Sequence, residues 1–258
     1  SALTSTASTD TNGTAVTVYA GETATLAAET MSTGTLANYT TTLSCDNGVT
    51  PSGTNGQSSN TITIPNTVSG LITCTYTNTR KSATLRVAKA WGANSISGNV
   101  ANIGATTGLI NNTSALTSTA STDTNGTAVT VYAGETATLA AETMSTGTLS
   151  NYTTSLSCDN GVTPSGSNGQ SSNTITIPNT VSGLITCTYT NTRKSATLRI
   201  AKAWGANSIS GNVANIGATT GLINNTSALT STASTDTNGT AVTVYAGETA
   251  TLAAETMS

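Results

Sequence analysis

The chain has 258 residues, of which 7% are charged and 3% aromatic, and its net charge is −3 with no histidine and no phenylalanine. Its basic residues form only the short group Arg80, Lys81, Arg86 and Lys89 and the copy of this group at 193–202. The chain therefore offers no cationic surface for phosphates, which argues against nucleic-acid binding. No run approaches the roughly 18 apolar residues that a membrane-spanning helix needs, so no membrane span is expected in this sequence.

Short segments rich in β-branched residues, separated by Gly, Asn, Asp or Pro, predict β-strands along the chain. In chain order, the predicted strands of the first copy are 15–20, 23–29, 39–45, 61–64, 71–79 and 83–91. No segment holds a helical period for three turns. We therefore expect an all-β fold in which Ig-like sandwich domains follow one another in a linear array.

Alternation within segment 71–79 predicts a half-buried strand. The side chains predicted to face inward are Ile72, Cys74, Tyr76 and Asn78. The opposite face carries Thr73, Thr75 and Thr77, with the copies Thr186, Thr188 and Thr190 further along the chain. Segment 83–91 places Leu85, Val87, Lys89 and Trp91 on one face.

The sequence is a tandem repeat. Residues 1–32 return unchanged at 114–145 and again at 227–258, which gives a period of 113 residues. The two full copies differ only at four small, shape-preserving pairs: Ala37/Ser150, Thr42/Ser155, Thr54/Ser167 and Val87/Ile200. A unit of this size is ordinary for one domain, so we expect a window from a longer array of domains rather than a short-period solenoid.

The corner Arg80–Lys81–Ser82 is the predicted domain boundary. It divides the chain into a partial repeat at 1–80 that lacks its first strands, a complete sandwich at 81–193 and a truncated repeat at 194–258. The corner is too short for a flexible linker, so successive repeats should stack closely. Because the copies are almost identical, we also expect that neighbouring repeats can exchange their first strands.

Each full copy carries two cysteines, Cys45 and Cys74 in the first and Cys158 and Cys187 in the second. Two cysteines without histidine cannot make a zinc site, and their separation of 29 is not that of a CxxC redox motif. We therefore predict one structural disulfide per copy, which places the protein outside the reducing cytosol.

Other chemistry has little support in the sequence. The lack of histidine excludes Ser-His-Asp and Cys-His catalysis and His-ligated metals. The carboxylates are spread along the chain, and although their spacing alone leaves a glycosidase pair open, we expect no catalytic residues, no metal and no cofactor. The segment starting at Asp10 begins like a calcium loop but lacks the later Glu, so an Asx turn explains it better.

Three segments resemble the Cna-B/SpaA-type, prealbumin-like repeats of bacterial pilins and surface adhesins. They are ATLRVAKAW at 83–91, ATLAAETMSTGTLSNY at 137–152 and ITCTYTNT at 185–192. In such domains a Lys on the first strand bonds covalently to an Asn on the last, promoted by a buried acid. The resemblance thus implies Lys89 as the amine, Asn191 as the electrophile and Glu142 as the acid.

The residues themselves support this isopeptide bond only in part. Lys89 and Asn191 both lie on predicted inward faces, and apolar surroundings favour the neutral, nucleophilic form of a lysine. Glu142 comes three residues after Leu139, so strict alternation puts it on the outer face unless a bulge intervenes. The alternative is an edge lysine that snorkels to water and an Asn that satisfies backbone groups.

Two functions follow from these patterns. The first is a disulfide-stapled stalk of a secreted bacterial surface adhesin or extracellular fibre, whose partners are neighbouring repeats of the same chain or identical chains. The second is a repeated binding module for glycan, ice or a host protein, which would use the Thr-rich strand face. Threonine also suits any solvated strand, so the first function is the stronger prediction.

Overall fold

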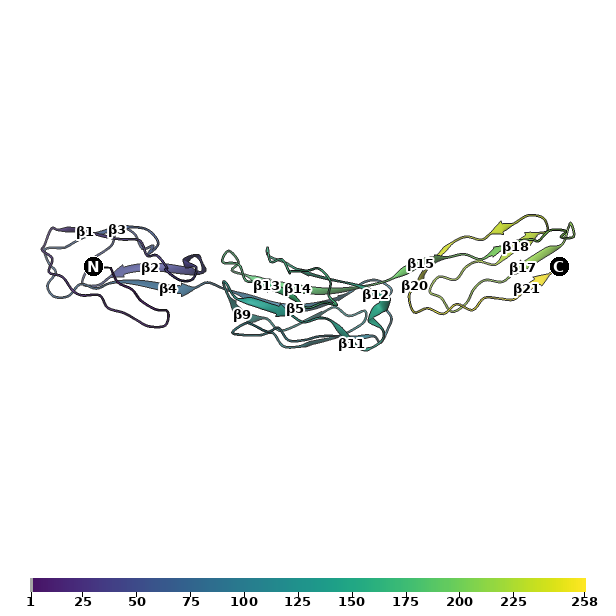
Figure 1. Ribbon diagram of the computed structural model, residues 1–258, viewed down its shortest axis with the longest axis horizontal. Helices are drawn as coiled ribbons and strands as arrows, with labels where there is room; N and C mark the ends of the chain where they lie inside the picture. The colour runs from purple at the N-terminus through teal and green to yellow at the C-terminus, as the bar shows by residue number, and fades with distance from the viewer. Residues whose placement is uncertain (1) are drawn as a thin grey trace. The chain divides into compact units, whose positions relative to one another are not determined.

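The computed structural model describes residues 2–258, which divide into two compact units. Unit 1 runs to Ala83 and includes Tyr132–Gly134 and Pro178–Ser182, and unit 2 consists of Thr84–Val131, Glu135–Ile177 and Gly183–Ser258. Both units are built from short strands, with two 3-10 turns at Leu36–Asn38 and Leu149–Asn151 (Figure 1). No α-helix occurs between residues 2 and 258, and the predicted all-β fold is confirmed. In the same range, no helix is long and apolar enough to cross a membrane.

Unit 1 contains two antiparallel two-stranded sheets, β1-β3 and β2-β4. Their strands are β1 (Thr23–Leu26), β2 (Tyr39–Cys45), β3 (Asn60–Thr63) and β4 (Cys74–Arg80). A small core forms around the buried side chains of Val49, Ile62 and Ile64. Cys45 and Cys74 pack against this core, so both β2 and β4 are anchored to it.

Unit 2 contains the remaining strands, except that Ser82, Ala83 and Tyr132 at strand ends belong to unit 1. The first nine are β5 (Ser82–Trp91), β6 (Val100–Ile103), β7 (Leu116–Thr119), β8 (Thr124–Asn125), β9 (Val129–Tyr132), β10 (Thr136–Leu139), β11 (Thr143–Thr146), β12 (Tyr152–Cys158) and β13 (Asn173–Thr176). The others are β14 (Leu184–Arg193), β15 (Ser195–Leu198), β16 (Ala201–Lys202), β17 (Val213–Ile216), β18 (Leu229–Thr232), β19 (Thr237–Asn238), β20 (Val242–Tyr245) and β21 (Glu255–Met257).

The largest sheet of unit 2 has the order β12-β14-β5-β8, with β9 also paired to β5. Strand β14 lies at its centre, antiparallel to β12 and parallel to β5. The other sheets of unit 2 are β10-β13, β11-β6-β7, β15-β20, β16-β19 and β18-β17-β21. The first and last strands of segment 81–193 are therefore hydrogen-bonded neighbours.

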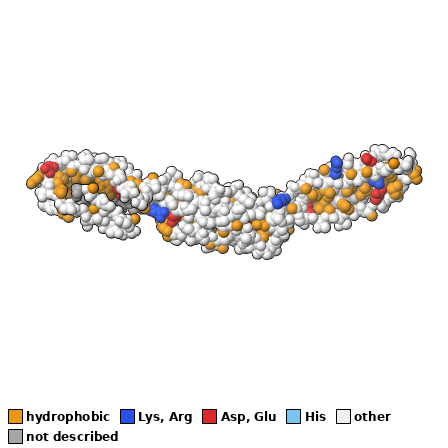
Figure 2. All heavy atoms as spheres, viewed as in Figure 1, with side chains coloured by type: hydrophobic (Ala, Val, Ile, Leu, Met, Phe, Trp, Pro, Cys, Tyr) orange, Lys and Arg blue, Asp and Glu red, His pale blue; other side chains and the backbone are white. Residues whose placement is uncertain are grey.

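The burial of β14 follows the predicted alternation. Ile185, Cys187, Tyr189 and Asn191 have no exposed surface, whereas the threonines between them are half-buried. Buried side chains from several other strands join them, namely Leu85, Ile103, Val131, Leu139, Tyr152 and Ile175. These side chains make up the buried interior of segment 81–193. Outside it, Figure 2 shows few charged side chains on the face in view, as the composition requires.

One expectation is wrong, and another is not observed. Segment 15–20 is not a strand, although its copies form β9 and β20, which pair with β5 and β15. Residues 2–80 contain no equivalent of β5, so segment 15–20 has no such partner. Strand exchange is also not observed, because β5 pairs with β8, β9 and β14, all within 81–193. The boundaries near Arg80 and Arg193 stay a prediction.

Candidate covalent cross-link sites

Lys89 lies on β5 with its amine inside the protein. Its side chain is fully buried, and its Nζ donates hydrogen bonds to the backbone carbonyls of Ala90 (2.7 Å) and Tyr189 (3.2 Å). The parallel register of β5 and β14 places Lys89 beside Tyr189 and Trp91 beside Asn191. A lysine side chain can span this diagonal between adjacent strands. The amine is therefore held against the strand that carries Asn191.

Glu142 lies inward, contrary to strict alternation from Leu139. Strand β10 ends at Leu139 and pairs with β13, whereas β11 begins at Thr143 and pairs with β6. The chain crosses between two sheets at residues 140–142, so alternation does not continue through them. The backbone N–H of Glu142 donates to the carbonyl of Gly169 (2.7 Å), and its side chain is fully buried. A break between strands, rather than a bulge, turns the carboxyl inward.

Glu142 is the meeting point of the three predicted side chains. Nδ2 of Asn191 donates to Oε1 of Glu142 at 2.6 Å, and Nζ of Lys89 lies 3.7 Å from the same oxygen. The other carboxyl oxygen, Oε2, and Oδ1 of Asn191 are buried without a hydrogen-bond partner. An amine, an amide and a carboxyl thus converge, and one oxygen of the carboxyl and the oxygen of the amide are still able to accept a hydrogen bond.

The electrostatics of this site favour neutral groups. Burial lowers the pKa of Lys89 to about 8, against the opposing attraction of Glu142. Burial also raises the pKa of Glu142, against the opposing effects of Lys89 and Asn191. A neutral amine is a nucleophile and a protonated carboxyl is a proton donor. The buried setting therefore prepares both groups for acid–base chemistry.

Alternation placed Trp91 and the tyrosine of the last strand on inward faces, but it did not predict their contacts at this site. The ring of Trp91 lies 4.4 Å from Nζ of Lys89, and its Nε1 donates to Oγ of Ser118 (3.0 Å). The hydroxyl of Tyr189 donates to the carbonyl of Ala140 (2.6 Å), next to the crossing that carries Glu142. The sequence signals were the spacing of Lys and Trp in AKAW and the alternation of the last strand, which put its Tyr and Asn on one face.

The flanking copies hold parts of the same arrangement. In residues 2–80, Nδ2 of Asn78 donates to Oε1 of Glu29 at 2.5 Å, and that copy has no equivalent of Lys89. In residues 194–258, Nζ of Lys202 lies 3.0 Å from Oε1 of Glu255, and that copy has no equivalent of Asn191. Glu29 therefore contacts the Asn, and Glu255 contacts the Lys, when only one of the two partners is present.

Both cysteine pairs form disulfides, Cys45–Cys74 and Cys158–Cys187. In each pair the cysteines lie directly opposite each other on adjacent antiparallel strands. Their Cα atoms are 4.0 Å apart, closer than the expected range of about 4.4–6.8 Å. Direct cross-strand neighbours approach to roughly 4.5 Å even without a disulfide, which explains why the separation is short.

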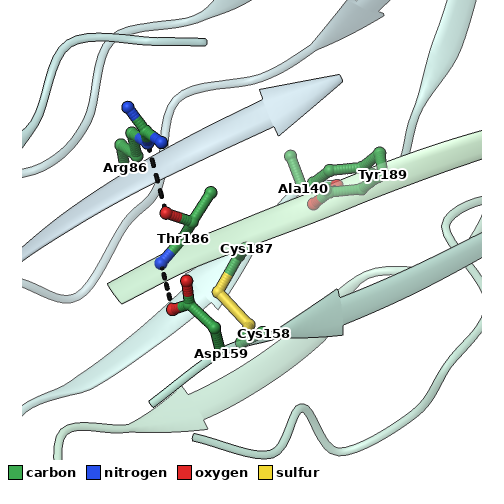
Figure 3. The surroundings of a disulfide bond; sticks show 7 residues. All are labelled: Arg86, Ala140, Cys158, Asp159, Thr186, Cys187 and Tyr189. Carbon is green, nitrogen blue, oxygen red and sulfur yellow. Dashed lines mark hydrogen bonds between the residues drawn. A yellow bond between two sulfur atoms is a disulfide. The ribbon is translucent and has the colours of Figure 1, made fainter. Parts of the chain in front are cut away.

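The surroundings of Cys158–Cys187 connect three strands (Figure 3). The backbone N–H of Thr186 donates to Oδ1 of Asp159 (2.6 Å), and Nε of Arg86 donates to Oγ1 of Thr186 (3.2 Å). Strands β12, β14 and β5 are thus tied together at this end of the sheet. Asn191 lies further along β14, toward the other end.

The threonine face of β14 borders a depression with a volume of about 400 Å³. Its lining residues are Arg86, Ala88, Lys89, Ala90, Asp123, Asn125, Ser157, Cys158, Asp159, Thr186 and Thr188. Thr186 is already engaged by Arg86, so one hydroxyl of the predicted binding ladder has a partner within the fold. Among residues 2–258, no three His, Cys, Asp or Glu side chains are grouped closely enough to hold a metal ion.

Comparison with known proteins identifies one family. The family model SpaA_3, described as a prealbumin-like fold domain, matches residues 1–80 and 84–193. The match spans most of the chain and includes all six predicted cross-linking residues and the predicted acid Glu142. No curated protein and no solved structure matches the chain.

Proposed function

Because the chain belongs to the SpaA_3 family of prealbumin-like fold domains, we propose that its repeats form the stalk of a bacterial surface adhesin or extracellular fibre. In this proposal each complete repeat is closed by an isopeptide bond between Lys89 and Asn191, next to its disulfide. The observation that carries it is the convergence of Lys89, Glu142 and Asn191 in a fully buried site.

The isopeptide bond forms when the amine of Lys89 replaces the amide nitrogen of Asn191, which leaves as ammonia. The neutral Nζ of Lys89 attacks Cγ of Asn191, a new C–N bond forms, and the bond from Cγ to Nδ2 breaks. Glu142 accepts a proton from Nζ and delivers one to Nδ2, which leaves as ammonia. Atoms and charge balance without an oxidant or a cofactor. The 2.6 Å hydrogen bond that Nδ2 donates to Glu142 places the carboxyl within proton-transfer distance of the leaving group.

The position of the bond suits a load-bearing element. Strands β5 and β14 are the first and last strands of segment 81–193 and run parallel as neighbours. A bond from Lys89 to Asn191 would carry tension from one to the other without loading the residues between them. The repeat could then be pulled from both ends without unfolding its core.

The disulfides support a location outside the cytosol. Cys45–Cys74 and Cys158–Cys187 leave no free cysteine in residues 2–258, and such bonds persist in oxidising compartments. Near identity between copies also suits a spacer, because whole repeats can be gained or lost without changing its role.

Single-molecule stretching of the chain tests the load-bearing role. The wild-type segment 81–193 should release no length from the residues between Lys89 and Asn191, whereas Lys89→Ala should unfold and extend. Lys202→Ala is the matched control, because Lys202 occupies the same position in a copy without the Asn partner. Equal extension of wild type and Lys89→Ala would refute the role.

The ligand-binding alternative stays a prediction. It would place a glycan, an ice surface or a host protein against Thr186, Thr188 and Thr190. Binding of the wild-type chain to glycan arrays or ice, lost on changing Thr188 and Thr190 to Val, would favour it over the stalk.

A further inference from the structure

Arg193, the last residue of β14, is a buried arginine that takes no part in the proposed cross-link. The side chain is only 8% exposed, and its Nε donates to the carbonyl of Ala246 at 2.8 Å. A second guanidinium nitrogen donates to the carbonyl of Asn94 at 3.1 Å. The guanidinium carbon lies 5.6 Å from the ring centroid of Tyr245. All four residues belong to unit 2, and Arg193 joins two segments far apart in sequence.

The backbone reinforces these contacts. The N–H of Ala246 donates to the carbonyl of Lys194, and the N–H of Lys194 donates to that of Asn151, each at 2.9 Å. Gly247 follows with a φ of 82°, a conformation that favours glycine. A Cβ at Gly247 would lie 2.8 Å from Nδ2 of Asn151 and 3.2 Å from Cδ1 of Ile96. The turn at 245–248 therefore fits closely against Asn151 and Ile96.

The surface that receives this turn is itself fixed in place. The hydroxyl of Tyr152, which is fully buried, accepts hydrogen bonds from the N–H of Ile96 and from Nδ2 of Asn99, each at 2.9 Å. Ile96 is half-buried, whereas its copy Ile209, with no such turn beside it, is 71% exposed. The turn thus covers an apolar side chain that is otherwise open to water.

Unit 1 contains a second instance of the arrangement. Nε and a second guanidinium nitrogen of Arg80 donate to the carbonyl of Ala133 at 3.1 and 2.9 Å, and the guanidinium lies 5.5 Å from the ring of Tyr132. The N–H of Ala133 donates to the carbonyl of Lys81, as its copy does in unit 2. The contacts of the arginine with the Tyr-Ala pair therefore recur one period apart, whereas the hydrogen bond to Asn94 is made by Arg193 and not by Arg80.

We propose that the surface formed by Asn94, Ile96 and Asn151 is a docking site for the Tyr-Ala-Gly-Glu turn of the next repeat, locked by Arg193. The partner is a second copy of the same repeat, and the recognition is chemical: a guanidinium that binds a carbonyl and stacks on a tyrosine. Glu248 maintains the shape of the turn, because its carboxylate accepts the N–H groups of Tyr245 (2.7 Å) and Ile223 (3.0 Å). The docked turn restricts motion at the Lys194 connection.

The docking site rests on the proposed stalk function, because a restricted joint between repeats matters only in a chain that bears load. Its contacts, however, do not require the Lys89–Asn191 bond. Hydrogen–deuterium exchange of the whole chain tests it, whereas intact mass tests the bond, so the two can fail separately. Arg193→Ala should accelerate exchange of the Lys194 and Ala246 amides by roughly tenfold or more, because it removes hydrogen bonds from a charged donor. Protection in β14 at 185–191 should be unchanged.

Gly247→Ala adds a Cβ to the docked turn that would clash with Asn151 and Ile96, and it should also accelerate exchange of the Lys194 and Ala246 amides. Matched controls are Arg199→Ala, which removes an exposed arginine, and Gly211→Ala, which adds backbone strain at a φ of 87° where no atom lies within 4 Å. Unchanged exchange at Lys194 and Ala246 in both test variants would overturn the proposal. Equal loss of protection throughout β14 would also overturn it, because Arg193 would then only stabilise its own sheet.

Discussion

Asn191 donates a 2.6 Å hydrogen bond to Glu142 while both side chains are buried, at 0% and 2% exposure. The equivalent pair, Asn78 and Glu29, makes the same contact in a copy that has no lysine at the site. The Asn–Glu contact therefore does not depend on the amine. The acid thus holds the amide with or without an amine beside it, which favours proton transfer to the leaving group.

Replacing the acid should slow formation of the bond. Glu142→Gln keeps a side chain of the same shape that can still accept from Asn191, but it cannot transfer a proton. We expect the rate of ammonia loss in freshly folded protein to fall by roughly 10²–10⁴-fold, as for other general acids and bases. Mass spectrometry over time measures the rate. Glu29→Gln, in the copy without the lysine, is the control and should leave the rate unchanged.

The rate of bond formation should depend on pH in a bell shape. The pKa of Lys89 is lowered to about 8, so raising the pH toward 8 increases the fraction of neutral, nucleophilic amine. The pKa of Glu142 is raised by burial, so its carboxyl keeps the proton that it must donate to a higher pH than an exposed glutamate does, and it loses that proton as the pH rises through its own raised pKa. Refolding at a series of pH values with timed mass analysis gives the profile. A rate independent of pH across this range would contradict the assigned roles.

Reduction of Cys158–Cys187 should destabilise the repeat. Closing a loop of this length contributes about 3.5 kcal/mol on the chain-entropy model. Denaturant unfolding of Lys89→Ala with and without a reductant measures this contribution free of the second cross-link. The midpoint should fall on reduction, and an unchanged midpoint would show that the strand pairing alone holds β12 to β14.

Alternation in the sequence predicted the burial of β14 well. Ile185, Cys187 and Asn191 face inward because a paired strand turns every second side chain to the same side. The same rule failed at Glu142, because it applies only within one continuous strand and the chain changes sheet at residues 140–142. The family resemblance pointed to Glu142 where the period of two did not.

Contacts between distant segments could not be predicted from local patterns. In the sequence, Arg193 stands out only as the end of the predicted repeat 81–193, because its burial depends on Tyr245 and Asn94, which are remote in sequence. The strand at 15–20 was predicted from composition and is absent, because a strand also needs a partner. Both cases depend on tertiary pairing rather than on propensity.

Intact mass of the monomeric chain, measured after reduction of both disulfides, tests the central claim most directly. The account predicts a mass lower than the sum of the residues by one ammonia molecule, because only segment 81–193 contains Lys89, Glu142 and Asn191 together. Lys89→Ala should abolish this deficit and lower the melting temperature, and Lys202→Ala should retain it. A wild-type mass equal to the sum of its residues would contradict the account, leaving Cys158–Cys187 as the covalent staple of the repeat.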